Sequence, residues 1–165
     1  MTAQIHDRIR FNKESYGILS VAGGPLVTPE QFGTSSEIAD SSCWRRYYVV
    51  YELTDSGFYL RELTMLRRDG DYVPIDGVLP ESDKESDYPT YHNLNVPVPF
   101  SGRIRIARGF IEDLYVHGGF QSPTAFRTVY DLTLENGRMV KMKDRSKVMA
   151  IGRIWDSLCR PFRFS

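Results

Sequence analysis

The sequence predicts an all-β domain, an antiparallel barrel or strongly curved sheet of about eight strands, with one α-helix near the C-terminus. The 165 residues include ten tyrosines and nine phenylalanines, and aromatic residues favour pleated, half-buried surfaces over helices. Short runs of Val, Ile, Tyr, Phe and Thr are separated by turn residues at close spacing, which is typical of antiparallel strands. The length and the 41% hydrophobic content fit one domain, residues 1–165, that buries its own core.

Two hairpins are the clearest elements. The segment 45–63 contains two apolar runs separated by Thr-Asp-Ser-Gly, and the segment 128–143 contains two separated by Glu-Asn-Gly-Arg. Asn-Gly supplies the positive φ angles that a two-residue type I′ turn requires. In that register Glu135 faces Arg138, and such an opposite-charge pair contributes about 0.2–1 kcal/mol.

Further strands are expected at 8–11, 15–19, 102–107 and 113–117, with a weaker candidate at 72–75. Several strands carry apolar residues on both faces, as in the run 47–51, so each face of the sheet needs a cover. Two long loops, 20–42 and 76–99, connect these strands and are long enough to cover an opening.

A helix at 146–158 provides one cover. Asp144 or Ser146 can cap its start, and Pro161 stops it. Gly152 within the helix indicates a close approach to the sheet. Four apolar residues recur at the spacing of a single helical stripe: Val148, Ile151, Trp155 and Leu158.

Charge and composition exclude several partner classes. Lys plus Arg and Asp plus Glu both number 21, which gives no global electrostatic case for nucleic acid or an anionic membrane. The N-terminal segment carries Asp7, Arg8 and Arg10, so it does not read as a signal peptide, and no apolar run reaches the length of a membrane-spanning helix. Cys43 and Cys159 alone do not make a disulfide framework, and whether they pair is left open. We expect a cytoplasmic protein.

Motifs for catalysis, metal ions and phosphate are absent from the sequence. There is no G-x-S-x-G, no C-x-x-C, no H-x-x-x-H and no P-loop. Asp69, Asp71 and Asp76 are spaced somewhat like a calcium loop, but Val73 takes the place of an oxygen ligand. We therefore expect no metal and no cofactor.

An aromatic and basic set on the predicted strands remains as the candidate ligand-binding site. Tyr and Arg side chains together stack on, and hydrogen-bond to, a planar or anionic ligand, and strand alternation would place several of them on one face. The candidates are Tyr47, Tyr51, Tyr59, Arg61, Arg103, Arg105, Tyr115 and His117. The alternative is an outer strand face whose arginines reach into solvent.

A group of uncharacterised bacterial all-β proteins resembles this chain in its Trp-Arg-x-Tyr strand, its F-S-G strand and its N-G hairpin. The matching segments are KESYGILS (13–20), GGPL (23–26), CWRRYYVVYEL (43–53), GFYLREL (57–63), FSGRIRIARG (100–109) and YDLTLENGRMVKMKD (130–144). The resemblance implies an antiparallel barrel or strongly curved sheet and no assigned reaction, cofactor or partner. The chain is more loosely similar to lipocalin-like barrels, which also have eight strands and a late helix, but it lacks their early G-x-W.

Three functions are compatible with the sequence. The first is a non-enzymatic binding module for a small planar or anionic ligand at the mouth of the barrel. The second is a protein-interaction, inhibitor or accessory module: residues 69–88 hold seven acids against one lysine, and residues 138–165 are basic, so either region can dock a partner protein or a second copy of the chain. The third is an enzyme that uses His117 as a general base.

Overall fold

One sheet makes up most of the computed structural model, which describes residues 4–35, 43–66, 72–82 and 88–159. Its strand order is β10-β9-β8-β2-β1-β3-β4-β6-β5, and β7 pairs beside β4. All pairs are antiparallel except β1 with β3, which are parallel. The elements are β1 (Arg8–Phe11), β2 (Glu14–Ala22), η1 (Pro29–Phe32), β3 (Tyr47–Thr54), β4 (Gly57–Met65), β5 (Glu81–Ser82), β6 (Pro89–Tyr91), β7 (Val96–Pro97), β8 (Gly102–Phe110), η2 (Glu112–Leu114), η3 (Pro123–Ala125), β9 (Phe126–Glu135), β10 (Arg138–Asp144) and α1 (Ser146–Cys159).

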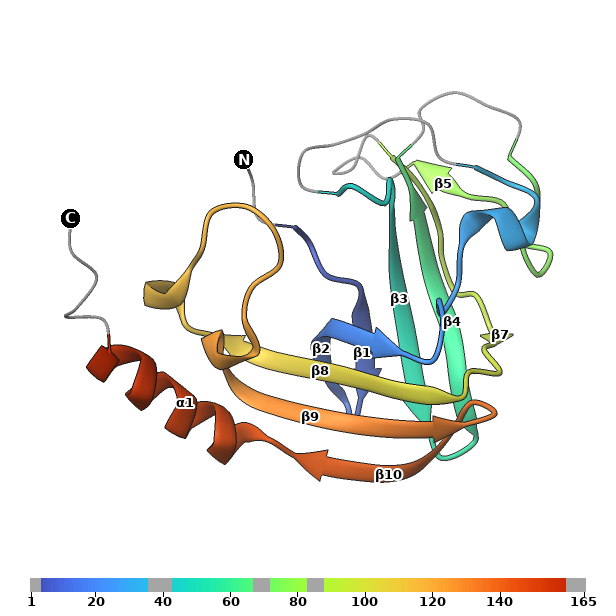
Figure 1. Cartoon of the computed structure of the whole chain (residues 1–165). Coiled ribbons are helices and arrows are strands. Elements are labelled where there is room, and N and C mark those ends of the chain that lie inside the picture. The colour runs from blue at the N-terminus through green and yellow to red at the C-terminus, as the bar shows by residue number, and fades with distance from the viewer. Residues whose placement is uncertain (1–3, 36–42, 67–71, 83–87, 160–165) are drawn as a thin grey trace.

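The sheet curls strongly but does not close. β3 and β4 cross the strands β8–β10 steeply (Figure 1), and the two ends of the strand order, β10 and β5, do not pair. Register shifts interrupt three of the pairings, β2–β8, β3–β4 and β9–β10, and such bulges bend the strands that carry them. The expected closed barrel is therefore not observed, whereas the strongly curved sheet is.

Apolar side chains fill the concave face of the curl. Tyr51 stacks on Phe58 with ring centroids 5.0 Å apart, and aromatic pairs of this kind strengthen a core beyond the area they bury. Residues from both halves of the sheet meet there at 0–1% exposure, among them Ile9, Tyr51, Phe58, Leu60, Ile104, Ile106, Leu132 and Leu134. The middle of the curl is thus packed rather than hollow.

Both predicted hairpins are confirmed. β3 and β4 form the first, and β9 and β10 form the second, joined by Asn136 and Gly137 at φ 47° and 75°. Arg138 pairs with Glu135 as the type I′ turn requires. The strands expected at 8–11, 15–19 and 102–107 are also present, as β1, β2 and β8.

The strand expected at 113–117 is wrong. Residues 112–114 form the 3-10 helix η2, and the chain continues as a loop to η3. The Gln121 side chain accepts a hydrogen bond from the Val116 N–H at 2.9 Å and donates one to the Val116 carbonyl at 2.8 Å. These two bonds satisfy the backbone of Val116, and the Leu114 and Tyr115 N–H groups donate to the Ile111 and Glu112 carbonyls, so these groups do not join a ladder.

Two other connections also differ from expectation. Of the weak candidate at 72–75, only Ile75 pairs, in an isolated bridge with Val78. The segment 76–99, expected as a loop, contains the short strands β5, β6 and β7. Their prolines are tolerated because Pro89 begins a strand and Pro97 lies in β7, whose one partner among the described strands is β4.

Helix α1 is confirmed, but its apolar stripe does not face the sheet. Asp144 accepts a hydrogen bond from the Ser146 N–H at 2.8 Å and so begins the helix. Met149 packs on a small cluster around Phe126, and Gly152 approaches Thr124 of η3 rather than the sheet, so the expected close approach is misplaced. The predicted stripe is mostly exposed: Val148 55%, Ile151 56%, Trp155 65% and Leu158 64%. Among the described residues, no helix has the length and hydropathy that crossing a bilayer requires.

Candidate functional site

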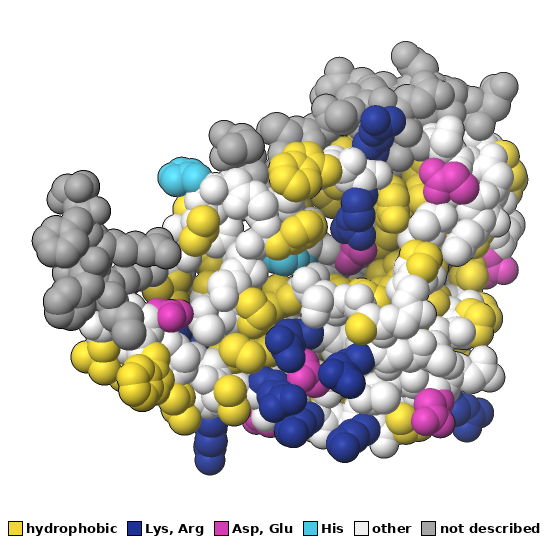
Figure 2. Space-filling view, in the orientation of Figure 1, with side chains coloured by type: hydrophobic (Ala, Val, Ile, Leu, Met, Phe, Trp, Pro, Cys, Tyr) yellow, Lys and Arg dark blue, Asp and Glu magenta, His cyan; other side chains and the backbone are white. Residues whose placement is uncertain are grey.

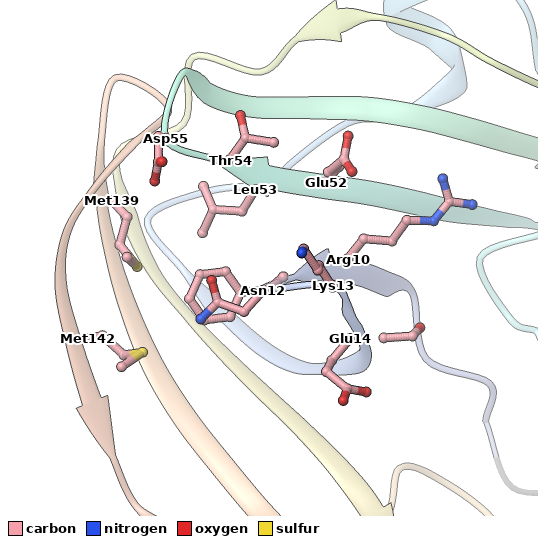
Figure 3. A pocket seen from close by; sticks show the side chains of 12 residues that line it. Arg10, Asn12, Lys13, Glu14, Glu52, Leu53, Thr54, Asp55, Met139 and Met142 are labelled. Atoms are coloured by element: carbon pink, nitrogen blue, oxygen red, sulfur yellow. The ribbon is translucent and has the colours of Figure 1, made fainter.

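A groove of about 650 Å³ opens at one end of the curled sheet (Figure 3). Three segments line it: residues 10–15 around the turn between β1 and β2, residues 52–55 at the end of β3, and Met139 and Met142 of β10. Its floor is apolar, because Phe11 and Leu53, which are partners in the parallel pairing of β1 and β3, are 5% and 4% exposed. The groove therefore lies directly against the core.

Two methionines form the β10 wall of the groove. Met139 and Met142 lie opposite Leu134 and Leu132 of β9, which are fully buried on the concave face. Residues three apart in a regular strand point to opposite faces, but the register shift between Met139 and Lys141 restores both methionines to the concave side. Their side chains are 40% and 48% exposed and point into the groove (Figure 3). Flexible thioethers in such a position adapt to ligands of different shape.

The opposite wall is a strained turn. Asn12 and Lys13 have φ angles of 50° and 64°, and they join Phe11 to Glu14, which are partners in the β1–β2 ladder. The second position of a type I′ turn usually carries glycine. A non-glycine residue in the left-handed region costs about 1–2 kcal/mol, and strain of this kind clusters at functional sites.

The rim of the groove carries charges of both signs, most of which are already paired. Arg10 forms an ion pair with Glu62. Glu52 accepts a hydrogen bond from Arg61 Nε at 2.7 Å, and Glu14 lies 2.9 Å from an Arg108 nitrogen. Lys13 and Asp55 make no ion pair with any described residue. The groove thus offers an apolar floor, one available cation and one available anion.

The eight candidate residues from the sequence do not share a face. Tyr47 and Tyr51 point inward from β3: Tyr51 is fully buried, and Tyr47 is half-buried with its hydroxyl donating to the Val27 carbonyl at 3.3 Å. Burial raises the pKa of both phenols. They are part of the core and do not border the groove.

Four of the eight point outward. The Arg61 guanidinium lies 5.3 Å from the Tyr59 ring centroid and donates to the Asn95 Oδ1 at 2.6 Å. Arg103 and Arg105 lie on the outer side of β8, where they alternate with the buried Ile104 and Ile106. Tyr115 and His117 complete the set and lie outside the sheet, in the loop after η2, with ring centroids 5.0 Å apart in an edge-to-face contact. Several of the candidates therefore point to the outer side of the sheet, but the full set does not, because the strand at 113–117 does not form and the two β3 tyrosines face inward.

The outer side of the β8–β10 half is basic. Figure 2 shows Lys and Arg side chains gathered over these strands. The register places Arg103, Arg105, Lys141 and Lys143 in this region, and Arg145 joins them through its hydrogen bond to Asp131. Asp131 of β9 is 5% exposed and accepts hydrogen bonds from Arg105 at 2.6 and 2.9 Å and from Arg145 at 2.9 Å. The Arg105 hydrogen bond, opposed by burial and supported by Arg145, holds the pKa of Asp131 below its usual range.

The other two functional hypotheses are not decided by these residues. His117 is exposed, and no carboxylate of the described chain is hydrogen-bonded to it. Within the described ranges there is no cluster of three or more His, Cys, Asp or Glu side chains able to hold a metal ion. Much of the acidic segment 69–88 lies outside the described residues, so its role as a docking region stays a prediction.

Sequence reasoning missed the groove. The position of Met139 in the groove could have been predicted, because the Asn-Gly turn places Met139 opposite Leu134. The bulge that brings Met142 to the same side has no sequence signature, and the approach of the β1–β2 turn depends on the parallel pairing of β1 with β3. Comparison with protein-family models, curated proteins and solved structures finds no match to this chain. The resemblance to the bacterial group and to lipocalin-like barrels accordingly stays a prediction.

Proposed function

We propose that this protein is a binding module and that the groove at the end of the sheet holds the apolar part of its ligand. One observation carries the proposal: Met139 and Met142 remain 40% and 48% exposed beside a floor, Phe11 and Leu53, that belongs to the buried core. Ligand sites combine such apolar surfaces with a few polar groups. A ligand that covers the methionines gains the burial that the sheet itself does not provide.

The rim narrows the chemistry of the ligand. An apolar or planar body fits between the methionine wall and the strained turn, and Lys13 is placed to meet an anionic group on that body. Asp55 is the corresponding position for a donor. The proposal keeps the planar or anionic ligand class that the sequence suggested, but it moves the site from the tyrosines and arginines of the strands to the open end of the curl.

The test is a titration with anilinonaphthalene sulfonate, which is both planar and anionic, followed by NMR of isotope-labelled methionine methyl groups. We expect the methyl signals of Met139 and Met142 to shift, and that of the buried Met65 to stay unchanged. The double variant Met139→Gln with Met142→Gln should weaken binding at least about tenfold, the effect of losing about 1.4 kcal/mol.

A matched control is needed because the dye can also bind the exposed stripe of α1. The double variant Ile151→Gln with Ile154→Gln removes apolar surface of comparable exposure, 56% and 59%, from the helix. The groove shifts should survive in this variant. If the Met139 and Met142 signals do not move in the native protein, or if the helix variant abolishes their shifts, the proposed function is wrong.

A further inference from the structure

The strand β10 is open along one side. Among the described strands it pairs with β9 alone, and it lies at the end of the strand order. Each of its seven residues is exposed, although the strand continues a tight hairpin. The N–H and C=O groups on the free side of an edge strand form a template to which another extended chain can add.

We propose that β10 accepts an extended segment of another protein as an additional strand, and that acidic and apolar residues alternate along this segment. This inference rests on the proposed function, because the apolar residues of the added strand are the part that enters the groove. It identifies the ligand as a peptide segment rather than a free small molecule.

The inward side of the added strand is specified by the methionines. Side chains of neighbouring strands lie beside one another on each face of a sheet. The inward residues of a strand next to β10 therefore lie beside Met139 and Met142 and above the floor formed by Phe11 and Leu53. Apolar residues at these alternate positions extend the core across the groove.

The outward side is specified by charge. Lys141 and Lys143 lie opposite Thr133 and Asp131 of β9. Asp131 is already held by Arg105 and Arg145, and neither lysine forms an ion pair within the described part of the chain. Acidic residues at the alternate positions of an added strand would lie directly across from these two lysines, where opposite charges are favourable.

The same charges disfavour a second copy of this chain. Two copies of β10 paired antiparallel about Met142 would bring Lys141 of each strand against Lys143 of the other, and like charges placed opposite one another are unfavourable. Edge strands often use lysines and bulges to prevent self-association. On β10 these features exclude an identical strand while they select an acidic one.

The experiment uses a labelled eight-residue peptide in which Glu and Val alternate, with capped ends. Its binding to the full chain is measured by fluorescence anisotropy, and the site is located from amide NMR shifts. We expect saturable binding with shifts along β10 and at the Met139 and Met142 methyl groups. A peptide whose two central residues are proline, and which therefore lacks a backbone donor on each edge, should bind at least about tenfold more weakly.

Charge variants test the outward contacts. The double variant Lys141→Glu with Lys143→Glu should lose affinity for the Glu–Val peptide at least about tenfold and should gain affinity for a Lys–Val peptide. The double variant Arg127→Glu with Lys147→Glu has the same net charge and alters exposed positions outside β10, on the part of β9 that does not pair with β10 and on α1. It should keep the native affinity within about twofold.

Each contrary outcome overturns the inference. If the proline peptide binds as tightly as the Glu–Val peptide, the ligand does not pair with β10 as a strand. If both charge variants lose the same affinity, Lys141 and Lys143 do not contact the peptide specifically. A dimer of the protein alone that the peptide dissociates, seen by sedimentation, assigns the edge to a second copy. If the dye shifts the Met142 methyl group but no β10 amide responds to the peptide, the inference fails and the proposed function stands; if neither shifts, both fail.

Discussion

The strands β9 and β10 are neighbours in one hairpin, yet their environments are opposite. On the concave face, Leu132 and Leu134 of β9 are fully buried, whereas their partners Met142 and Met139 on β10 are nearly half exposed. The two strands pair with one another in a single hairpin, and both have apolar residues on the concave face. What differs is position: β9 lies between two strands and under the core, while β10 is the last strand and nothing among the described residues covers it. Burial is therefore set by place in the sheet rather than by residue type.

The largest expected effect is the loss of stability when a buried leucine of β9 is truncated. Leu132→Ala should destabilise the protein by about 2–5 kcal/mol, because it leaves a cavity in a packed core. Met142→Ala, at the paired position on β10, should change the free energy of unfolding by no more than about 0.5 kcal/mol, as expected for an exposed site. Urea denaturation of both variants is the measurement. A similar loss in the two variants would mean that the methionine wall is part of the core.

The second largest effect is expected at the turn between β9 and β10, where Gly137 has no room for a side chain. A Cβ at Gly137, where φ is 75°, would lie 2.7 Å from the Val98 carbonyl oxygen. Gly137→Ala should therefore cost about 2–4 kcal/mol, from left-handed strain and this clash together. Gly77 has the same φ in a second two-residue turn, and its Cβ would meet nothing within 4 Å. Gly77→Ala should cost only the strain, about 1–2 kcal/mol. If both variants lower the melting temperature equally, the clash with the Val98 carbonyl does not contribute to the cost at Gly137.

A third test compares the buried acid of β9 with its exposed neighbour on β10. Asp131→Asn should cost about 1–3 kcal/mol at neutral pH, a value reduced because Arg105 and Arg145 are each about 30% exposed. Lys143→Gln should cost less than about 0.5 kcal/mol. Since the Asp131 pKa is lowered in the folded state, its contribution is present above the unfolded value of about 3.9 and is lost as the pH falls through the folded value.

The pH dependence of this contribution provides a control for the urea denaturation of Asp131→Asn. Native protein and the Asp131→Asn variant should differ in urea denaturation at pH 7 and converge as the pH falls well below 4. A difference that stays constant across this range would mean that the ionised carboxylate is not what stabilises the fold.

The smallest expected effect lies on the opposite wall of the groove. Lys13→Gly should stabilise the protein by about 0.5–1 kcal/mol, because relief of the left-handed strain exceeds the added entropy of glycine. The same variant should bind anilinonaphthalene sulfonate more weakly if the lysine meets its sulfonate. Thermal denaturation and dye titration on one sample measure both. If the variant is more stable but binds the dye with unchanged affinity, Lys13 does not take part in binding.

Much of the fold could be predicted because the relevant interactions are local. Asn136 and Gly137 determine the turn, the register and the Glu135–Arg138 pair. Asp144, one of the two capping candidates, accepts the hydrogen bond of the Ser146 N–H at the start of the helix. The candidate site could not be predicted in the same way. Alternation correctly sets Arg103 and Arg105 on one side of β8, but it cannot say which side of a curled sheet is concave, or that residues 113–117 form a 3-10 turn and a loop held by Gln121.

The sequence by itself determined the long strands β1, β2, β3, β4, β8, β9 and β10, the two hairpins and the position of the helix, since turn chemistry and apolar periodicity act over a few residues. Only the tertiary structure decided that β1 pairs in parallel with β3, that a bulge turns Met142 toward Met139, and that the stripe of α1 faces outward. These outcomes depend on contacts between residues far apart in the chain, where packing of the whole sheet outweighs the preference of any single segment.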